Sequence, residues 1–297
     1  MSDSKIIEVQ HITKRFKGLT AVKDVSFSVR EGGITGMIGP NGAGKSTCIR
    51  TLLGLIKPTS GSASVLGHDI VTEHDEILRS VGYLPSEINF YSGMKVKDVI
   101  KYSADIRKAE CSEMAAKLVD RLGLDVEKKV DDLSLGNRKK AGIVCALQHK
   151  PELLIMDEPT SGLDPLMQHE FFRILTELNA EGSTVFLSSH ILSEVQAHCR
   201  TAAFIKDGHI IISDRVDKLE NTGAKKIVLR GTLSDGFIGR LKEKRSDVTD
   251  LIIEDKYVSY LYSGDIAELL SVLAAEKPKD VSITEPTMEE IFMNYYE

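Results

Sequence analysis

The sequence predicts an α/β fold, built on a parallel sheet with crossover helices and joined to a smaller α+β unit. Three short apolar runs, at residues 34–38, 153–156 and 184–187, have the length and continuous hydrophobicity of strands that are buried on both faces. Each run is followed by a loop and a helical pattern, which is typical of strand–helix–strand units. A glycine-rich segment directly follows the first run, where such a sheet commonly holds a ligand.

Composition limits the class of protein. The 297 residues allow one large domain, or a large and a small one, and 42% hydrophobic with 28% charged residues is ordinary for a globular chain. We find no apolar run of about 20 residues and no N-terminus of the secretory kind, so we expect a chain that does not itself cross a membrane and that stays in the cytoplasm. The net charge of −6 argues against bulk nucleic-acid binding. The four cysteines form no CxxC pair, which favours free thiols.

The part before and around the apolar runs is also patterned. Alternation at residues 7–10 and 25–29 predicts half-buried strands of an antiparallel sheet. Between about residues 96 and 150, apolar side chains recur at helix spacing, as at 118–122 and 143–147. We therefore predict a helical insertion between two strands of the parallel sheet.

The pattern changes after residue 222. Strands are predicted at 227–229, 251–253, 258–262 and 281–284, with helices around 237–241 and 266–273. This βαββαβ order predicts a small ferredoxin-like unit. Asp265 and Glu268 have the spacing of a capping box that opens the second helix. Thr287 and Glu290 predict a final helix before Ile291 and Phe292.

The segment G-P-N-G-A-G-K-S-T at residues 39–47 matches the phosphate-loop pattern. Its glycines permit a tight turn whose backbone N–H groups approach a triphosphate, and the helix that begins near Lys45 adds its positive end. Lys45 is expected to reach the β- and γ-phosphates and Ser46 to bind Mg²⁺. A chance glycine-rich turn does not explain the preceding strand and following helix. The predicted nucleotide contacts here are Gly39, Asn41, Gly42, Gly44, Lys45, Ser46 and Thr47.

Two carboxylates end the second apolar run. Asp157 is placed to hold Mg²⁺ through water, and Glu158, one residue later, can face an attacking water. Taken alone, the pair reads as a solvated acidic loop. Together with the phosphate loop it indicates a catalytic edge, because open parallel sheets bind ligands beyond the carboxyl ends of their strands.

Three further segments narrow the choice among families of nucleotide-binding proteins. They are L-S-L-G-N at residues 133–137, S-G-L-D at 161–164, and His190 at the end of the third apolar run. In this order and spacing, the five motifs closely resemble those of the ATP-binding subunit of ABC transporters, over about residues 5–220. The tail E-P-T-M-E-E-I-F at 285–292 resembles exporter-type subunits that serve drugs, antibiotic peptides, polysaccharides or sodium.

The resemblance implies an ABC-type P-loop ATPase fold with a mixed sheet core, an antiparallel β subdomain and a helical subdomain. The cassette is expected over residues 1–222, with its helical subdomain at about 86–150, and an accessory α+β domain over 223–297. It further implies a homodimer or heterodimer of cassettes, with ATP between the phosphate loop of one chain and residues 134–136 of the other. ATP hydrolysis then drives separate transmembrane permease subunits, which hold the chain on the inner face of the membrane.

The resemblance also implies residue roles. Glu158 is the general base, His190 contacts the γ-phosphate and orients the lytic water, and Lys45 binds phosphate. Ser134 and Gly136 meet the γ-phosphate of the partner's ATP. For four residues the sequence leaves more than one interpretation open. Phe16 stacks on adenine or is a core side chain at a strand end. Asp164 links the two sites across the dimer, or is only a turn residue or helix cap, and His190 could instead be a buried core histidine. Cys48 is a reactive thiol at a helix start or a buried packing residue.

This chain departs from the family at two places. Ser86 occupies the position of a glutamine that helps bind Mg²⁺, so it keeps an oxygen ligand but has a shorter reach. L-S-L-G-N replaces L-S-G-G-Q, with Ser134 and Gly136 retained, and we expect ATP binding to persist. The helical insertion, together with the loop at residues 86–95 that contains Tyr91 and Met94, is expected to form the groove for the permease.

Two other functions are considered. A soluble ABC-type ATPase that acts on nucleic acid or ribosomes is disfavoured, because the chain has one phosphate loop, no sustained heptads and a negative charge. A P-loop kinase has no use for the segment at 134–137, and a GTPase would need a guanine-reading motif, of which the sequence shows none.

Overall fold

The computed structural model describes residues 4–220, 223–243, 247–287 and 289–291. The chain divides into two compact units, residues 1–214 and 215–297. The sequence placed this division later, after residue 222. The short helix α8 (Val216–Glu220) accounts for the difference, because it groups with the second unit. In the described part of the chain, we find no helix that is both long and apolar enough to cross a membrane.

A six-stranded sheet forms the centre of the first unit, in the order β10-β9-β3-β8-β7-β6. The three predicted apolar runs are β3 (Ile34–Ile38), β7 (Leu153–Asp157) and β8 (Thr184–Ser189), and every residue of each is buried. Their parallel pairing confirms the prediction. Strands β6 (Val81–Leu84), β9 (Thr201–Lys206) and β10 (His209–Arg215) complete the sheet.

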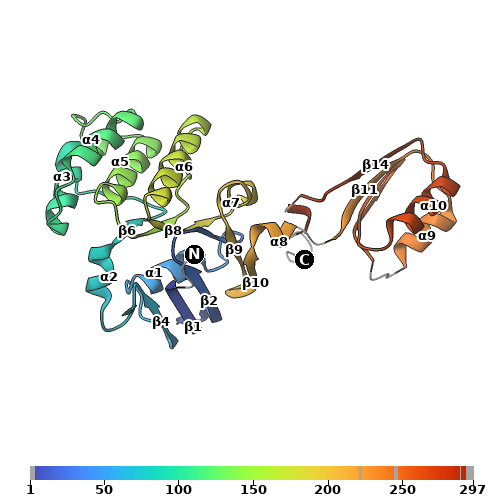
Figure 1. Cartoon of the computed structure of the whole chain (residues 1–297), viewed down its shortest axis with the longest axis horizontal. Helices are drawn as coiled ribbons and strands as arrows, with labels where there is room; N and C mark the ends of the chain where they lie inside the picture. Colours follow the sequence, from blue (N-terminus) through green and yellow to red (C-terminus); the bar gives the residue numbers. More distant parts are fainter. Residues whose placement is uncertain (1–3, 221–222, 244–246, 288, 292–297) are drawn as a thin grey trace. The chain divides into compact units, whose positions relative to one another are not determined.

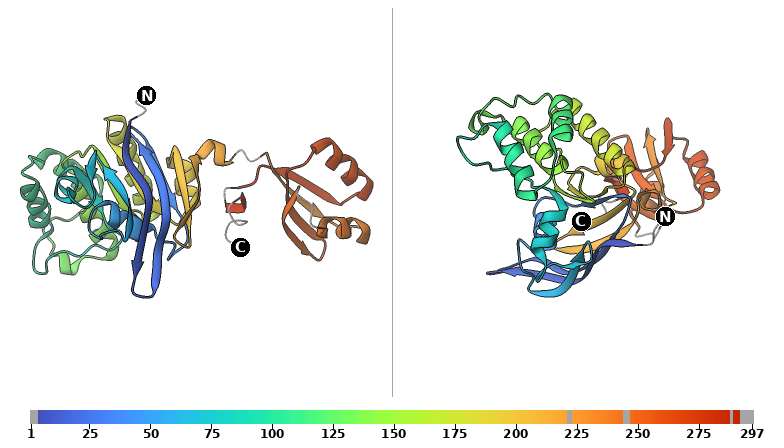
Figure 2. Two further views of the ribbon diagram at one scale, coloured as in Figure 1. Left: turned by 90° about the horizontal axis from the view of Figure 1, so that it is seen from below. Right: turned by 60° about the vertical axis from the view of Figure 1, so that its left-hand side comes forward.

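The predicted antiparallel sheet is present, with the order β2-β1-β4-β5. Its strands are β1 (Lys5–Phe16), β2 (Leu19–Arg30), β4 (Ser60–Val65) and β5 (His68–Asp69), and Figure 2 shows β1 and β2 side by side in blue. Phe27 of β2 stacks on Phe186 of β8 with ring centroids 5.6 Å apart. The two sheets therefore share one hydrophobic core.

Helices cover the central sheet and form the predicted insertion. Helices α6 (Pro165–Ala180) and α7 (Leu192–His198) connect strands of the central sheet. Helices α1 (Lys45–Leu52) and α2 (His74–Ser80) lead from the central sheet to the antiparallel sheet and back. The insertion consists of α3 (Val96–Arg107), α4 (Ser112–Arg121), a short 3₁₀ turn (Val130–Asp132) and α5 (Leu135–Leu147), which Figure 1 shows gathered in green. Arg121 ties the insertion to α6, since its guanidinium donates to Glu170 at 2.6 Å and to Glu177 at 3.0 Å.

The second unit confirms the predicted ferredoxin-like arrangement. Its elements are β11 (Lys225–Arg230), α9 (Asp235–Lys242), β12 (Val248–Glu254), β13 (Tyr257–Tyr262), α10 (Ile266–Glu276) and β14 (Asp280–Thr284). The strand order is β12-β13-β11-β14, and all neighbours are antiparallel. A separate hydrophobic core lies between this sheet and the two helices.

The capping box near the C-terminus is also confirmed. The Thr287 N–H donates to the Glu290 carboxylate at 2.9 Å, and the Glu290 N–H donates to the Thr287 hydroxyl at 3.3 Å. Residues 289–291 are helical, as expected for a helix that this box opens. Phe292, which the sequence placed in the same helix, lies outside the described residues.

Gly82 in β6 lies where helix α5 of the insertion packs closely on the central sheet. A Cβ at this position would lie 2.4 Å from the Ala146 carbonyl oxygen and 2.6 Å from side-chain atoms of Leu154 and Pro151. We expect Gly82→Ala to lower the free energy of unfolding by about 1–3 kcal/mol, measured by urea denaturation.

Gly33→Ala is the matched control, because its Cβ would have no neighbour within 4 Å. Its unfolding free energy should stay within about 0.5 kcal/mol of the native chain. Equal unfolding free energies of the two variants would contradict this prediction, because the α5–β6 contact would then accommodate a Cβ at residue 82 without loss of stability.

Candidate nucleotide-binding site

The phosphate loop joins β3 to α1 at the carboxyl end of the central sheet. Gly42 and Gly44 have φ angles of 83° and 107°, a region that side chains with a Cβ seldom adopt. A Cβ at Gly44 would lie 2.5 Å from the Ala21 carbonyl oxygen, and one at Gly39 would lie 2.2 Å from that of Ile205. The glycines are thus required both by the turn and by the backbone behind it.

A cavity of about 640 Å³ opens in front of the loop. It brings together most of the site residues that the sequence predicted and several that it did not. Its lining is Phe16, Leu19, Thr20, Ala21, residues 41–47, Ser86, Glu158, Asp207 and Gly208. Phe16 is 45% exposed at the end of β1, so the alternative of a core phenylalanine is wrong.

Lys45 is the buried cation of the site. Its side chain is only 5% exposed, and its ammonium donates to the carbonyl oxygens of Gly39 at 2.7 Å and Pro40 at 3.2 Å. The same nitrogen lies 3.1 Å from Oε1 of Glu158. Two of the three N–H donors of the ammonium therefore form hydrogen bonds with loop carbonyls, and the contact with Glu158 is an ion pair.

Glu158 joins Lys45 to His190. Its Oε2 lies 2.7 Å from Nδ1 of His190, whereas Lys45 contacts the other carboxylate oxygen, Oε1. Its backbone has a φ of 49°, a left-handed conformation that is uncommon for glutamate and is found at functional turns. The His190 side chain is 45% exposed, so it is not a buried core histidine.

Asp157 fits a cation-binding role. It is fully buried, and its Oδ1 accepts a hydrogen bond from the Ser188 hydroxyl at 2.7 Å. Its Oδ2 is buried and has no hydrogen-bond partner among the residues that the structure describes. A buried carboxylate oxygen of this kind needs a partner, and a hydrated cation supplies one.

The oxygen groups beside the phosphate loop suit Mg²⁺, which keeps water ligands, better than a metal ion that is bound by protein side chains alone. No group of three histidine, cysteine, aspartate or glutamate side chains that could hold a metal occurs in the described ranges. Mg²⁺ is commonly held by one or two protein oxygens, with water and substrate phosphates completing its shell. Ser46 and Ser86, which line the cavity, have hydroxyls of the required chemistry.

Lys139 is a part of the site that sequence reasoning missed. It is 2% exposed in α5, and its ammonium donates to the carbonyl oxygens of Ser86 at 3.0 Å, Glu158 at 3.1 Å and Pro85 at 3.4 Å. Burial lowers its pKa to about 8, against the opposing pull of Asp157 and Glu158. Its signal in the sequence is its place four residues before Ile143, on the buried face of the helix.

A turn between β9 and β10 supports the phosphate loop and was also missed. Asp207 and Gly208 have φ angles of 48° and 78°, as a two-residue hairpin turn requires. The Gly208 N–H donates to the Ala43 carbonyl at 3.0 Å, and the Lys23 N–H donates to the Gly208 carbonyl at 2.8 Å. The Asp-Gly dipeptide between two runs of alternating residues is the signal that could have revealed it.

The residues expected to serve a partner's ATP lie outside the cavity lining. Ser134 caps α5 by accepting from the Asn137 N–H at 3.4 Å, and Asp164 caps α6 by accepting from the Met167 N–H at 3.1 Å. A Cβ at Gly136 would lie 2.8 Å from the Gly162 carbonyl oxygen. The segments at residues 133–137 and 161–164 are therefore adjacent. Asp164 acts as a helix cap in this chain.

Comparisons with known proteins identify relatives. Residues 22–161 match the family model described as "ABC transporter". The chain is 34% identical to the bacitracin transport ATP-binding protein BcrA of Bacillus licheniformis, over 98% of this chain and 97% of that protein. It is 30% identical to the linearmycin resistance ATP-binding protein LnrL of Bacillus subtilis (strain 168), over 97% of each chain. A solved ATP-binding subunit of an ABC transporter superposes with a TM-score of 0.69 at 27% identity, covering 72% of this chain and 92% of that one.

Cys48 follows the phosphate loop but is not a reactive thiol. It is 1% exposed, and burial raises its pKa to about 12, so the alternative of a packing residue is confirmed. Burial also raises the pKa of Cys199 to about 12 and that of Cys145 to about 11. The helix start therefore does not activate this thiol, because desolvation outweighs it.

These thiols should resist alkylation in the folded chain. The thiolate is the reactive form, and at pH 8 a thiol with a pKa near 12 holds almost none of it. We expect iodoacetamide at pH 8 to label Cys48 slowly in the native protein and all four cysteines quickly in guanidinium chloride, as read by peptide mass spectrometry. Rapid native labelling of Cys48 would contradict this assignment.

Proposed function

This chain belongs to the ATP-binding subunits of ABC transporters, and on this premise we propose how its residues use ATP and which partners it serves. It binds ATP and hydrolyses it to power transport. The observation that carries the residue assignments is the chain of contacts from Lys45 through Glu158 to His190, at the carboxyl edge of β3, β7 and β8. The first unit holds this site, and we treat it as the cassette, with the helical subdomain at about residues 86–150.

The cavity orients the nucleotide from base to phosphate. Phe16 presents a half-exposed ring at one part of the lining, and the ammonium of Lys14 lies 5.0 Å from its centroid. An adenine stacked on this ring leaves its triphosphate directed to residues 41–47. Backbone N–H groups at the start of α1 then face the phosphates.

The catalytic step requires the Lys45 ammonium to exchange its present contacts for contacts with the triphosphate. The ammonium contacts two loop carbonyls and Glu158, and a triphosphate in the loop competes for these donors. Once Lys45 turns to phosphate, Glu158 accepts the proton of the lytic water as general base. His190 contacts Glu158 at Oε2, and in this proposal it also contacts the γ-phosphate and orients the lytic water.

Mg²⁺ would be held by the Ser46 hydroxyl, by Asp157 through water, and by Ser86 where the family has glutamine. When bound, it neutralises charge on the β- and γ-phosphates. Asp157 is kept in position by the Ser188 hydroxyl, which also accepts from the Glu158 N–H at 3.1 Å. One serine therefore aligns the cation-binding and the proton-accepting carboxylates.

A second cassette, identical or related, is proposed to complete each site. Ser134 and Gly136 lie at the start of α5, apart from this chain's own cavity, where they can face ATP on a partner. Two apolar side chains near them are strongly exposed, Leu135 at 67% and Leu166 at 79%. Burial of such side chains favours association of two cassettes across this surface.

The membrane partner is proposed to dock on the helical insertion. Tyr91, Tyr102 and Ile106 are 71%, 46% and 61% exposed there, and the two tyrosine rings pack edge to face at 6.2 Å. An apolar patch of this kind suits a short helix of a permease subunit, which would hold the chain at the inner membrane face. The bacitracin and linearmycin relatives favour export of drugs or antibiotic peptides, and a transporter over a nucleic-acid or ribosome ATPase.

Glu158→Gln tests the assignment of the general base. The variant keeps the shape of the side chain but cannot accept a proton, so kcat for ATP should fall by about 100-fold or more while ATP still binds. Steady-state phosphate release and ATP binding measured by calorimetry report the two effects. ATP should also hold the variant as a longer-lived dimer in size-exclusion chromatography.

Glu152→Gln is the matched control, because Glu152 is exposed next to the start of β7. Its kcat should equal that of the native chain. A Glu158→Gln variant that hydrolyses ATP at the native rate would show that another group accepts the proton.

Lys139→Met tests whether the buried lysine positions the catalytic edge. Removing its ammonium leaves the carbonyls of Ser86 and Glu158 without a shared donor, so Glu158 is held less accurately. We expect kcat to fall about tenfold with KM for ATP nearly unchanged, since the phosphate loop is not touched.

Lys140→Met serves as control, because Lys140 is the half-buried neighbour in the same helix. It should keep the native kcat. Parallel loss of kcat and of ATP affinity in Lys139→Met would indicate general disruption of the fold instead of positioning.

A further inference from the structure

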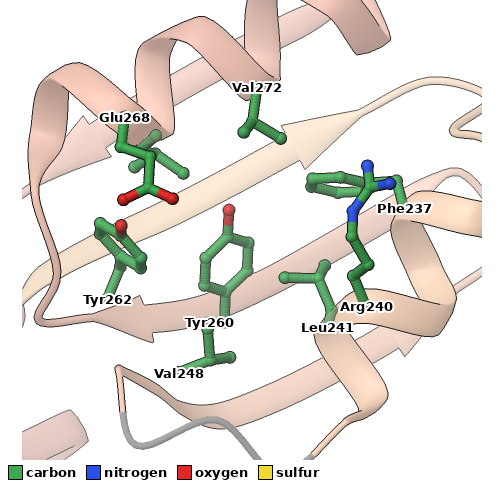
Figure 3. Close-up of a pocket in the computed structure, with 9 residues that line it drawn as sticks. Phe237, Arg240, Leu241, Val248, Tyr260, Tyr262, Glu268 and Val272 are labelled. Carbon is green, nitrogen blue, oxygen red and sulfur yellow. The ribbon is translucent and has the colours of Figure 1, made fainter.

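The ferredoxin-like unit contains a cavity that the ATPase chemistry does not use. It has a volume of about 200 Å³ and lies between helices α9 and α10 and strands β12 and β13 (Figure 3). Its lining combines apolar side chains with two tyrosines and two charged groups. The residues are Phe237, Arg240, Leu241, Val248, Tyr260, Tyr262, Glu268, Leu269 and Val272.

Tyr260 places an unsatisfied polar group in this cavity. The residue is 1% exposed, and its hydroxyl has no hydrogen-bond partner among the residues that the structure describes. Figure 3 shows this hydroxyl directed from β13 toward α10, into the lined space. Burial raises the pKa of Tyr260, so the hydroxyl stays protonated. Buried hydroxyls are nearly always hydrogen-bonded, and a bound molecule would supply the missing partner.

Glu268 adds a negative charge to the same space. The sequence predicted it as the reciprocal partner in the capping box of α10, but Asp265 caps this helix by accepting from the N–H groups of Ala267 at 2.7 Å and Glu268 at 3.0 Å. The Glu268 carboxylate instead lies at the solvent-exposed rim of the cavity, and none of the ion pairs among the described residues includes it. Figure 3 shows it extending from α10 toward the two tyrosines.

The positive group of the cavity is already balanced. The Arg240 guanidinium lies 3.4 Å from the Glu276 carboxylate and 6.0 Å from the centroid of the Phe237 ring. Glu268 at the exposed rim has no such counter-charge among the described side chains, so the unpaired charge at this cavity is negative. Aromatic faces at Tyr260, Tyr262 and Phe237 also favour a cation.

We propose that this cavity binds a small organic ammonium ion with an apolar body. The ammonium pairs with the Glu268 carboxylate and donates to the Tyr260 hydroxyl, whose oxygen can accept as well as donate. The apolar body packs among Leu241, Leu269 and Val272. Apolar cavities of about 150 Å³ hold one benzene ring, so this volume suits a ring with a short amine chain. The inference concerns the second unit and goes beyond the proposed transport function.

Titration with 2-phenylethylammonium chloride tests the proposal on the full chain. The chain has no tryptophan and eight tyrosines, so tyrosine fluorescence reports on the site, with calorimetry as a second measurement. We expect saturable binding with a Kd of about 1 mM or tighter. The neutral 2-phenylethanol should bind at least tenfold more weakly, and 3-phenylpropionate should not bind.

Variants separate the charged contact from the packing. Glu268→Gln should weaken binding of the ammonium about two- to fivefold, because the carboxylate is exposed, while Glu254→Gln, an exposed glutamate at the end of β12, should leave it unchanged. Tyr260→Phe should weaken binding several-fold and raise the unfolding temperature of the unliganded chain, because it removes the unsatisfied hydroxyl. Lys45→Ala should bind the probe normally, which separates this site from the ATP site.

Any one of several results overturns the proposal. These are no saturable binding of the ammonium, equal binding of the alcohol, or native affinity in Glu268→Gln. Binding of 3-phenylpropionate in preference to the ammonium would likewise overturn it, since Arg240 would then be the recognition group.

Discussion

The buried ammonium of Lys45 is the constraint on which the arrangement of the catalytic edge depends. A cation that is only 5% exposed must be paired, and its partners are two loop carbonyls and the Glu158 carboxylate. Those partners come from β3 and β7, which parallel pairing through β8 brings to one edge. The sheet order therefore determines which charges meet, and the loop glycines determine how closely they meet.

Two further contacts connect this edge to the rest of the first unit. The Asp207–Gly208 turn bonds to Ala43 in the phosphate loop and to Lys23 of β2, which joins the antiparallel sheet to the loop. Lys139 bonds to Ser86 and Glu158, which joins the helical insertion to the catalytic carboxylate. The side chain of Ser86 is short, and its backbone carbonyl is the group that bonds to Lys139. In this chain the link between that segment and Glu158 runs through backbone carbonyls and a buried lysine.

In the second unit, Glu268 does not form the reciprocal capping contact that its spacing from Asp265 predicts. Asp265 and Glu268 have capping-box spacing, and Asp265 does cap α10. Glu268, one helical turn further on, faces a cavity whose floor contains the Tyr260 hydroxyl. At the C-terminal end, Thr287 and Glu290 have the same spacing and form both reciprocal bonds. Local spacing is the same in both cases, so the packing of α10 on the sheet accounts for the difference.

The sequence by itself determined the fold class, the phosphate loop, the paired carboxylates and the βαββαβ order, because each depends on local periodicity or on residues that are adjacent in the chain. Strands β6, β9 and β10 were not predicted, since short strands carry a weak periodic signal. Only the tertiary structure decided that Glu158 lies between Lys45 and His190, that Lys139 is a buried donor, and that Cys48 is an inert thiol. Those properties depend on burial and on contacts between residues far apart in the chain, which arise only when the strands and helices pack together.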